Sequence, residues 1–217
     1  MFNYTDADKN LLADISGRMV REPITTTRIV LRPFRPGDLM DYYAYASQKE
    51  QQRLSGNCPC DCLEDAEAGL NFFLDPSHPP YAFAIELKAE QKVIGNVSIT
   101  RYPAEVLDEK MLTRRGIALS YILNEAYWNR GIMTEILESL YAMLFAQAEL
   151  DYIHSGYFLF NVASGRLQEK LGMKRWKEFV LEWNGEQIPT REMVIWREDW
   201  ENRQKARGFP GEKSKND

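Results

Sequence analysis

Short apolar segments and helix-like spacings alternate along the chain and predict strands and helices in turn. Apolar runs of the kind that sheet strands show occupy residues 28–34, 81–88, 92–100, 117–123, 152–160, 175–183 and 191–199. Helices are expected over residues 39–50, 62–74, 132–149 and 163–172; within 132–149 apolar residues recur every three or four positions. The interleaving predicts an α/β chain, a mixed sheet with helices on its faces.

The two ends of the chain differ from this central pattern. Leu11, Leu12, Ile15 and Met19 have amphipathic helical spacing, so residues 1–22 are expected to form an N-terminal helical extension. Residues 23–200 are long enough for one domain and too short for two. The polar stretch 201–217 is expected to be a flexible tail.

Charge and hydropathy exclude some classes of protein. The formal net charge of −5 argues against a general nucleic-acid-binding surface, which needs a basic footprint. No apolar run has the length of a membrane span, and the first ten residues, "MFNYTDADKN", lack a secretory signal pattern. The expected location is the cytoplasm.

The three cysteines, Cys58, Cys60 and Cys62, lie together in "NCPCDC". Their spacing lacks the two-residue gap of zinc knuckles and ribbons, and a fourth ligand would have to come from a distant histidine. The plainer interpretation is that Asp61 and Glu64 form a capping box that opens the helix after them. We therefore expect no metal site.

The segment "YWNRGIMTEI", residues 127–136, joins the apolar run 117–123 to the helix that follows it. A strand, a tight turn and a helix start leave backbone N–H groups unpaired at the positive end of the helix dipole, which is a ready anion site. Taken alone, Gly131 is better explained by a sharp entry into the helix. The surrounding motifs decide between the two interpretations.

Several ordered motifs resemble the GNAT acetyltransferases, and within them the RimJ/RimL-type protein N-acetyltransferases. They are "TTTRIVLRPFRPGDLMDYY", "VIGNVSI", "SYILNEAYWNRGIMTEIL", "NVASGRLQEKLGMKRW" and "REMVIWREDW", spread between about Thr25 and Trp200. The resemblance implies the GNAT fold: a mostly antiparallel central sheet of six to seven strands with helices on both faces. Its central strands would splay to form an acetyl-CoA cleft.

The resemblance also implies which residues bind acetyl-CoA. Backbone N–H groups of the turn would cradle the pyrophosphate; they belong to Asn129, Arg130, Gly131, Ile132, Met133 and Thr134. The pantetheine arm would pair with the backbone of Tyr121, Ile122 and Leu123 on one side and with Asn161 on the other. Met133 stands where the family has Gly or Ala, so its side chain must point away from the phosphates.

The catalytic groups are less clear than the cofactor groups. Many GNAT enzymes protonate the departing thiolate with a tyrosine seven residues after the strand-end asparagine, and Gln168 occupies that position. The RimJ/RimL type has a serine three residues after the asparagine, here Ser164, which implies a proton donor. A helix N-terminal hydroxyl that satisfies backbone donors explains Ser164 equally well.

No general base is evident in the sequence. Where RimJ/RimL relatives carry a strand glutamate, this chain has Ala118. Glu86 or Glu182 could act through water, although an exposed strand position is the simpler explanation for both. His154 is either a solvent-facing strand residue or a proton relay, and the first is the simpler choice.

The expected function is direct transfer of an acetyl group from acetyl-CoA to a primary amine, without a covalent enzyme intermediate. The favoured acceptor is a peptide or protein N-terminal amine, because it loses its proton more readily than a lysine side chain. Two alternatives stay open: a non-catalytic acyl-CoA sensor, and a polyamine or aminoglycoside acetyltransferase. The expected partners are acetyl-CoA, the amine and a second copy of the chain in a homodimer, with no nucleic acid and no membrane.

Overall fold

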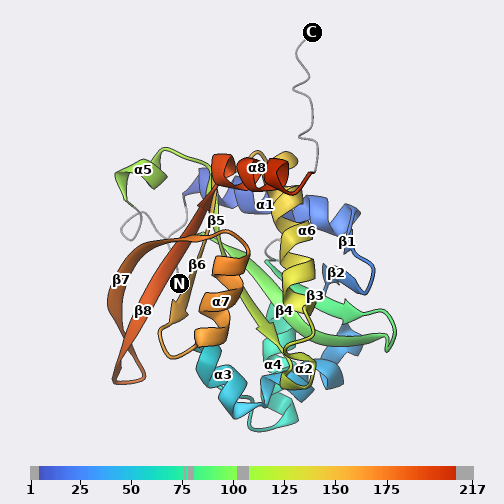
Figure 1. Cartoon of the computed structure of the whole chain (residues 1–217). Coiled ribbons are helices and arrows are strands. Elements are labelled where there is room, and N and C mark those ends of the chain that lie inside the picture. Colours follow the sequence, from blue (N-terminus) through green and yellow to red (C-terminus); the bar gives the residue numbers. More distant parts are fainter. Residues whose placement is uncertain (1–4, 76, 78–80, 102–107, 209–217) are drawn as a thin grey trace.

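A computed structural model describes residues 5–75, 77, 81–101 and 108–208. They form one open sheet of eight strands with helices on both faces (Figure 1). The strands are β1 (Ile24–Thr25), β2 (Ile29–Pro33), β3 (Ala82–Leu87), β4 (Lys92–Thr100), β5 (Gly116–Leu123), β6 (Tyr152–Phe158), β7 (Lys174–Trp183) and β8 (Glu186–Trp196). The α-helices are α1 (Asp6–Arg21), α2 (Leu39–Ala46), α3 (Lys49–Ser55), α4 (Leu63–Leu74), α5 (Glu109–Leu112), α6 (Ile132–Ala146), α7 (Val162–Lys170) and α8 (Arg197–Ala206).

The strand order is β1-β2-β3-β4-β5-β6-β8-β7, and all neighbours are antiparallel except β5 and β6. The parallel pair is short: Gly116–Ala118 lies against Tyr152–His154, and the ladder then stops. Both strands continue, to Leu123 and Phe158, so they diverge after three paired positions. The predicted splay of the central strands is therefore present.

Period-two alternation along the strands builds two unequal cores. On β3, Phe83 and Ile85 face the main core, which α1, α6 and α8 cover, whereas Ala82 and Ala84 face a smaller core under α2 and α4. Figure 1 shows α6 and α7 in front of the sheet. The two faces of the sheet are thus covered by different helices.

The N-terminal helix is joined to the sheet where the splay begins. Leu11, Ile15 and Met19 are buried in the main core. Arg101, just beyond β4, forms an ion pair with Asp8 of α1, and its guanidinium donates to the carbonyl of Gly116, the first residue of β5, at 2.6 Å.

Several expectations are corrected by the structure. The sheet has eight strands rather than six to seven; β1 has only two residues, too few to show a period. The helix expected over 39–50 is two helices, because the backbone of Gln48 is extended between α2 and α3. The cap of α4 pairs Cys62 with Asp65, rather than Asp61 with Glu64.

The polar stretch after residue 200 also begins differently from the expectation. Helix α8 continues to Ala206, held by buried Trp200 against Phe145 and by ion pairs of Arg203 and Arg207 with Glu138. Residues 209–217 of the expected tail lie outside the described residues, as do residues 102–107. Among the helices that the structure describes, none is long and apolar enough to cross a membrane.

Candidate active site

The divergence of β5 from β6 opens a cleft of about 890 Å³ that reaches both faces of the sheet. Tyr121 and Ser164 line it from the side of the main core. Glu192 lines it from the opposite face, because its neighbour Met193 points into the main core. A ligand in the cleft would therefore meet different groups above and below the sheet.

The turn before α6 has the features of an anion site. Gly131 is the N-cap of α6 with φ of 72°, and no side chain caps the helix. A Cβ at Gly131 would meet only a guanidinium nitrogen of Arg28, at 3.7 Å, so the approach to the backbone is open. Asn129, two residues earlier, also has a positive φ, 58°. The first-turn N–H groups of α6 therefore have neither intrahelical partners nor a side-chain cap, which suits a pyrophosphate.

Two side chains of this turn pack within the chain itself. Met133 is buried in the main core, as its position two residues past the glycine requires. Arg130 lies over the ring of Tyr127, with 5.2 Å from its guanidinium carbon to the ring centre. A second, more open hollow of about 490 Å³ lies beside Gly131 and Thr134.

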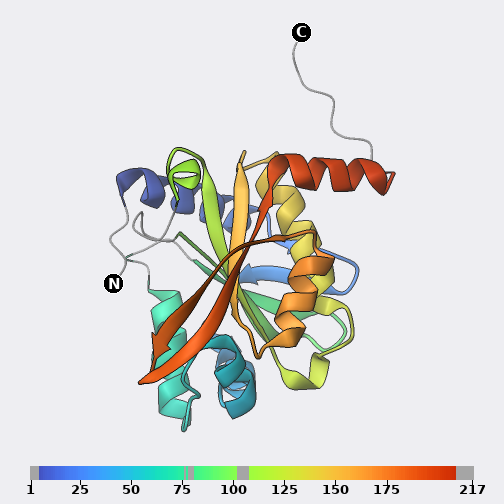
Figure 2. The same ribbon diagram turned by 60° about the vertical axis from the view of Figure 1, so that its left-hand side comes forward.

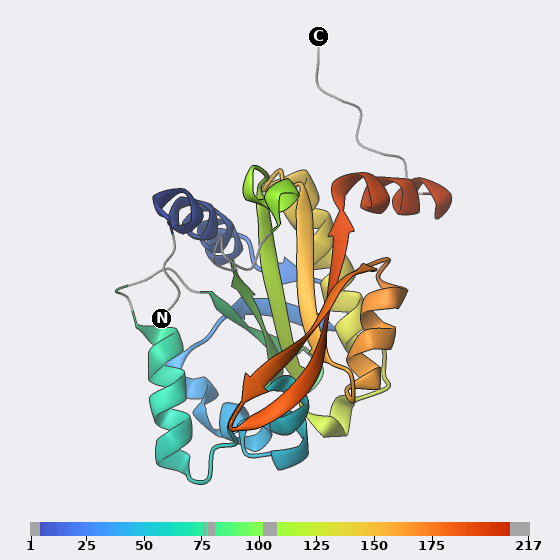
Figure 3. The same cartoon turned by 90° about the vertical axis from the view of Figure 1, so that its left-hand side faces the viewer.

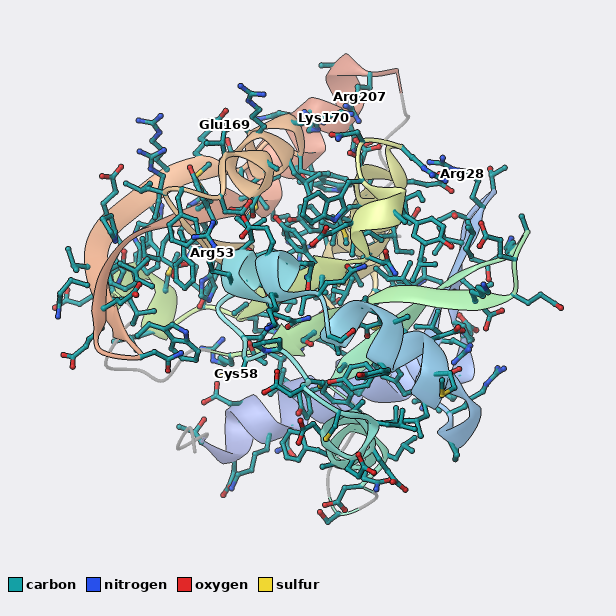
Figure 4. All side chains as sticks on the ribbon, turned by 90° about the horizontal axis from the view of Figure 1, so that it is seen from below. Arg28, Arg53, Cys58, Glu169, Lys170 and Arg207 are labelled. Carbon is teal, nitrogen blue, oxygen red and sulfur yellow. The ribbon has the colours of Figure 1, made fainter. Side chains whose placement is uncertain are left out.

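Arg28 is a cation at this turn that sequence reasoning missed. Its guanidinium donates to the carbonyl of Arg130 at 2.9 Å and pairs with Glu135 at 2.6 Å. Figure 4 shows Arg28 beside α6, on the same side of the molecule as Lys170 and Arg207. Arg28 is about a hundred residues from the turn in sequence, so no local motif could reveal it.

The cleft edge of β5 has the backbone geometry expected for pairing with an extended ligand. Tyr121, Ile122 and Leu123 pair with β4 on one side. On the other side the ladder to β6 has already ended. One carbonyl there is engaged: that of Leu123 accepts from the indole nitrogen of Trp128 at 2.7 Å.

Asn161 has a structural function in the chain itself. It is the N-cap of α7: its Oδ1 accepts from the backbone of Ser164 at 3.1 Å, and its Nδ2 donates to the carbonyl of Leu54 at 3.0 Å. The side chain thus joins α7 to α3. One amide hydrogen and one lone pair are left for a ligand.

Ser164 belongs to a hydroxyl cluster with Tyr121 and Gln168. Its Oγ lies 2.9 Å from the Tyr121 hydroxyl, and Gln168 Nε2 donates to both oxygens at 3.2 Å. Burial raises the pKa of Tyr121, an effect that these two hydrogen bonds partly offset. Position 168 has no tyrosine, but Tyr121 on β5 places a phenol hydroxyl beside Ser164. Strand alternation was the available signal, since it places Tyr121 on the same face as Leu119 and Leu123.

A carboxylate that the sequence did not reveal lies across the cleft from this cluster. Glu192 on β8 is 2% exposed, and its Oε2 lies 3.4 Å from His154 Nδ1. Its cross-strand partner is Gly156, where a Cβ would come within 2.6 Å of the Glu192 carboxylate oxygen. Because Ala118 pairs with His154 on β6 and Gly156 on β6 pairs with Glu192, the carboxylate is two strands over and two residues along from the vacant glutamate position.

The two glutamates that were named from sequence as candidate bases do not line the cleft. Glu86 accepts from Arg32 at 2.6 Å, and Arg32 also forms a bidentate pair with Asp38, which makes a structural network. Glu182 is exposed on β7. His154 is buried beside Glu192, so the expectation of a solvent-facing residue is wrong.

The cysteines lie at the mouth of the cleft rather than in its chemistry. Cys58 and Cys60 line it. All three thiols are free, and burial raises the pKa of Cys60, which disfavours a thiolate nucleophile. Across the described ranges, no three His, Cys, Asp or Glu side chains are placed to hold a metal ion.

A splayed parallel strand pair, an uncapped glycine turn and a two-faced cleft define an acyl-CoA-dependent acetyltransferase class. The acetyltransferase (GNAT) domain model matches residues 28–174. The chain belongs to the GNAT family and is an N-acetyltransferase; acetyl-CoA is the acetyl donor of this family.

Among similar proteins is an uncharacterized N-acetyltransferase, YnaD, from Bacillus subtilis. It is 25% identical over 152 residues, which cover 70% of this chain and 82% of that protein. A GCN5-related N-acetyltransferase from Brucella melitensis has a TM-score of 0.72 at 18% identity, with 86% of this chain and 83% of that chain covered.

Two further solved structures are those of enzymes whose names give different acceptors. A spermidine N-acetyltransferase from Vibrio cholerae, in complex with CoA and spermine, has a TM-score of 0.64 at 18% identity and covers 82% of this chain and 100% of its own. A ribosomal-protein-S5-alanine acetyltransferase from Vibrio fischeri has a TM-score of 0.63 at 18% identity. The match covers 82% of this chain and 98% of that chain. At these identities the likeness concerns the fold alone.

Proposed function

We propose that this N-acetyltransferase is of the RimJ/RimL type and acetylates the α-amine of a peptide or protein. One observation carries the proposal: a hydroxyl cluster and, among the described residues that line the cleft, one buried carboxylate face the same cleft from opposite sides of the sheet. Acyl transfer to an amine needs a group that removes a proton from the amine and another that protonates the departing thiolate. In the proposal, Glu192 on one face removes the proton from the amine, and the hydroxyl cluster on the other face protonates the thiolate.

Acetyl-CoA supplies the activated acetyl thioester, and the turn from Asn129 to Thr134 fits its pyrophosphate. In the proposal, the backbone of Tyr121, Ile122 and Leu123 aligns the pantetheine arm. Ser164 donates the proton from its Oγ and is re-protonated through the Tyr121 hydroxyl, 2.9 Å away. Gln168 Nε2 orients both oxygens.

Glu192 receives the proton that the acceptor amine releases. Its carboxylate lies in the room over Gly156, and His154 holds it from the side. One carboxylate on this face favours an amine that is easily deprotonated. At pH 7.5 the free energy needed to deprotonate the amine is roughly 4 kcal/mol for a lysine side chain. For an α-amine it is about 0.3–0.7 kcal/mol, from the reference pKa values of the two groups.

Mass spectrometry of peptides that contain both amines, after incubation with acetyl-CoA and the chain, tests the proposal. We expect acetylation at the α-amine to exceed that at the lysine ε-amine by at least about 100-fold, as the population of neutral amine dictates. Predominant ε-acetylation would exclude the α-amine assignment. Binding of acetyl-CoA without acetylation of any amine would indicate an acyl-CoA sensor instead.

A further inference from the structure

We infer that the acceptor carries one positive charge, at the reacting amine, with a bulky apolar group directly beside it. For a peptide this means an aromatic or branched aliphatic first residue. The inference rests on the proposed function and specifies its substrate. It depends on the charges in the cleft, on the exposed apolar side chains of β7 and on their register with Glu192.

The charge of the cleft fits a single cation. Glu192 is the one acidic residue among the described residues that line it. Lys177, which opposes Glu192 across the β7–β8 pair, adds a positive charge to the lining, and its ammonium lies 5.7 Å from the centre of the Phe179 ring. A polyamine has a further ammonium group for each amine, and each would need a carboxylate or water in place of the apolar lining. The described lining therefore disfavours a polycation.

An apolar wall extends outward from Glu192 along β7. Phe179, Leu181 and Trp183, the acceptor wall, all line the cleft, although Phe179 and Trp183 are still 38% and 37% exposed. Figure 2 and Figure 3 show β7 and β8 as a long twisted hairpin that curves away from the other strands. Large apolar side chains that line a cleft and stay exposed mark a site for an apolar ligand.

The register of the hairpin places this wall next to the carboxylate. Lys177 pairs with Glu192, Phe179 with Thr190 and Leu181 with Ile188. Every second residue of a strand faces the same side, at a spacing of about 7 Å. The group attached directly to the amine would therefore contact Phe179, and a longer apolar chain would extend to Trp183.

Other aromatic side chains line the cleft from the body of the domain. They are Tyr42 and Tyr45 of α2, Phe73 of α4 and Tyr81 just before β3. Tyr42 contacts Tyr45 and Phe73 edge-on, with ring centres 5.3 and 5.8 Å apart. These rings pack on one another and leave the hairpin side chains as the less covered part of the apolar lining.

The experiment measures kcat/KM by CoA release for peptides that differ only in the first residue, with spermidine as a further acceptor. Peptides that begin with Phe or Leu should react roughly 10–100-fold faster than those that begin with Ser or Asp, because one large apolar side chain is buried. Spermidine should be the poorest acceptor. A better reaction with spermidine, or equal rates for all first residues, would overturn the inference.

Substitutions on the hairpin locate the preference. Phe179→Ser should remove most of the advantage of Phe-first peptides. Val180→Ser is the matched control: Val180 is adjacent on β7, is 57% exposed and does not line the cleft, so its variant should keep the preference. Loss of the preference in both variants would overturn the assignment to the acceptor wall. Acetyl-CoA binding without acetylation of any peptide would instead refute the proposed function.

Discussion

The two sides of the cleft are built in different ways. In the proposed assignment, the cofactor side comes from one continuous stretch, from Tyr121 on β5 through Gly131 to Thr134 on α6, and it acts mainly through backbone groups. The acceptor side combines side chains from remote elements, from Tyr42 on α2 to Glu192 on β8. A backbone site needs only a local conformation, whereas a side-chain site needs the whole tertiary fold. Substitutions should therefore separate donor binding from acceptor chemistry.

The largest effect is expected from Gly131→Asp, on the cofactor side. A carboxylate beside the pyrophosphate costs several kcal/mol through like-charge repulsion, so CoA binding should fall below detection. Isothermal titration calorimetry with CoA measures it. Gly208→Asp is the control, since Gly208 also has a positive φ, 80°, in open surroundings away from the cleft. Tight binding by the Gly131 variant would remove the phosphate site from this turn.

Next in size is Glu192→Gln, on the acceptor side. Loss of the base should lower kcat by about 10³-fold with acetyl-CoA affinity unchanged, within the range of general base catalysis. The deficit should shrink as the pH rises from 7 to 9, because the amine then loses its proton unaided. Glu182→Gln, on the exposed part of β7, should behave as the parent. A pH-independent deficit would show that Glu192 is only structural.

A smaller effect is expected from Ser164→Ala. We expect turnover to fall about 10²-fold, the low end for a lost proton donor, because the Tyr121 hydroxyl is 2.9 Å away and can donate in its place. The double variant with Tyr121→Phe should lose substantially more. Single-turnover kinetics with an α-amine peptide measure both. An undiminished rate in the double variant would remove the hydroxyl cluster from the mechanism.

The smallest effect concerns the stability of the acceptor side. Burial raises the pKa of Tyr42 to about 12. The folded chain therefore keeps a phenol proton that the unfolded chain loses above pH 10, so the free energy of unfolding is unaffected below pH 10 and falls as the pH rises towards 12. At pH 11 that fall is about 1.3 kcal/mol before any discount, so Tyr42→Phe should recover roughly 0.5–1 kcal/mol of it once partial exposure is taken into account. Urea unfolding at pH 9 and 11, with Tyr43→Phe as control, measures it; equal losses in the two variants would contradict it.

The sequence predicted most of the elements, since seven of the strands have apolar runs that report burial directly. β1 and the break between α2 and α3 escaped prediction because tertiary contacts, not periodicity, define them. The turn before α6 was predictable because its conformation depends on a positive φ at one residue, Gly131, and glycine is the residue that favours it. Glu192 was not, because its position depends on the β6–β8 register and on the room over Gly156. Arg28 was missed because its contact with the turn at Arg130 is also a tertiary one, whereas the side of β5 that Tyr121 faces could have been read from strand alternation.

The room over Gly156 also constrains how this chain can change over generations. Alanine at position 156 would displace the Glu192 carboxylate from its place beside His154, and a smaller residue at 192 would leave an unfilled space over the glycine. A substitution at either position alone would therefore give a protein with a displaced carboxylate or an unfilled space. Gly156 and Glu192 thus form a coupled pair, and a descendant that moved its carboxylate to another strand would have to alter both.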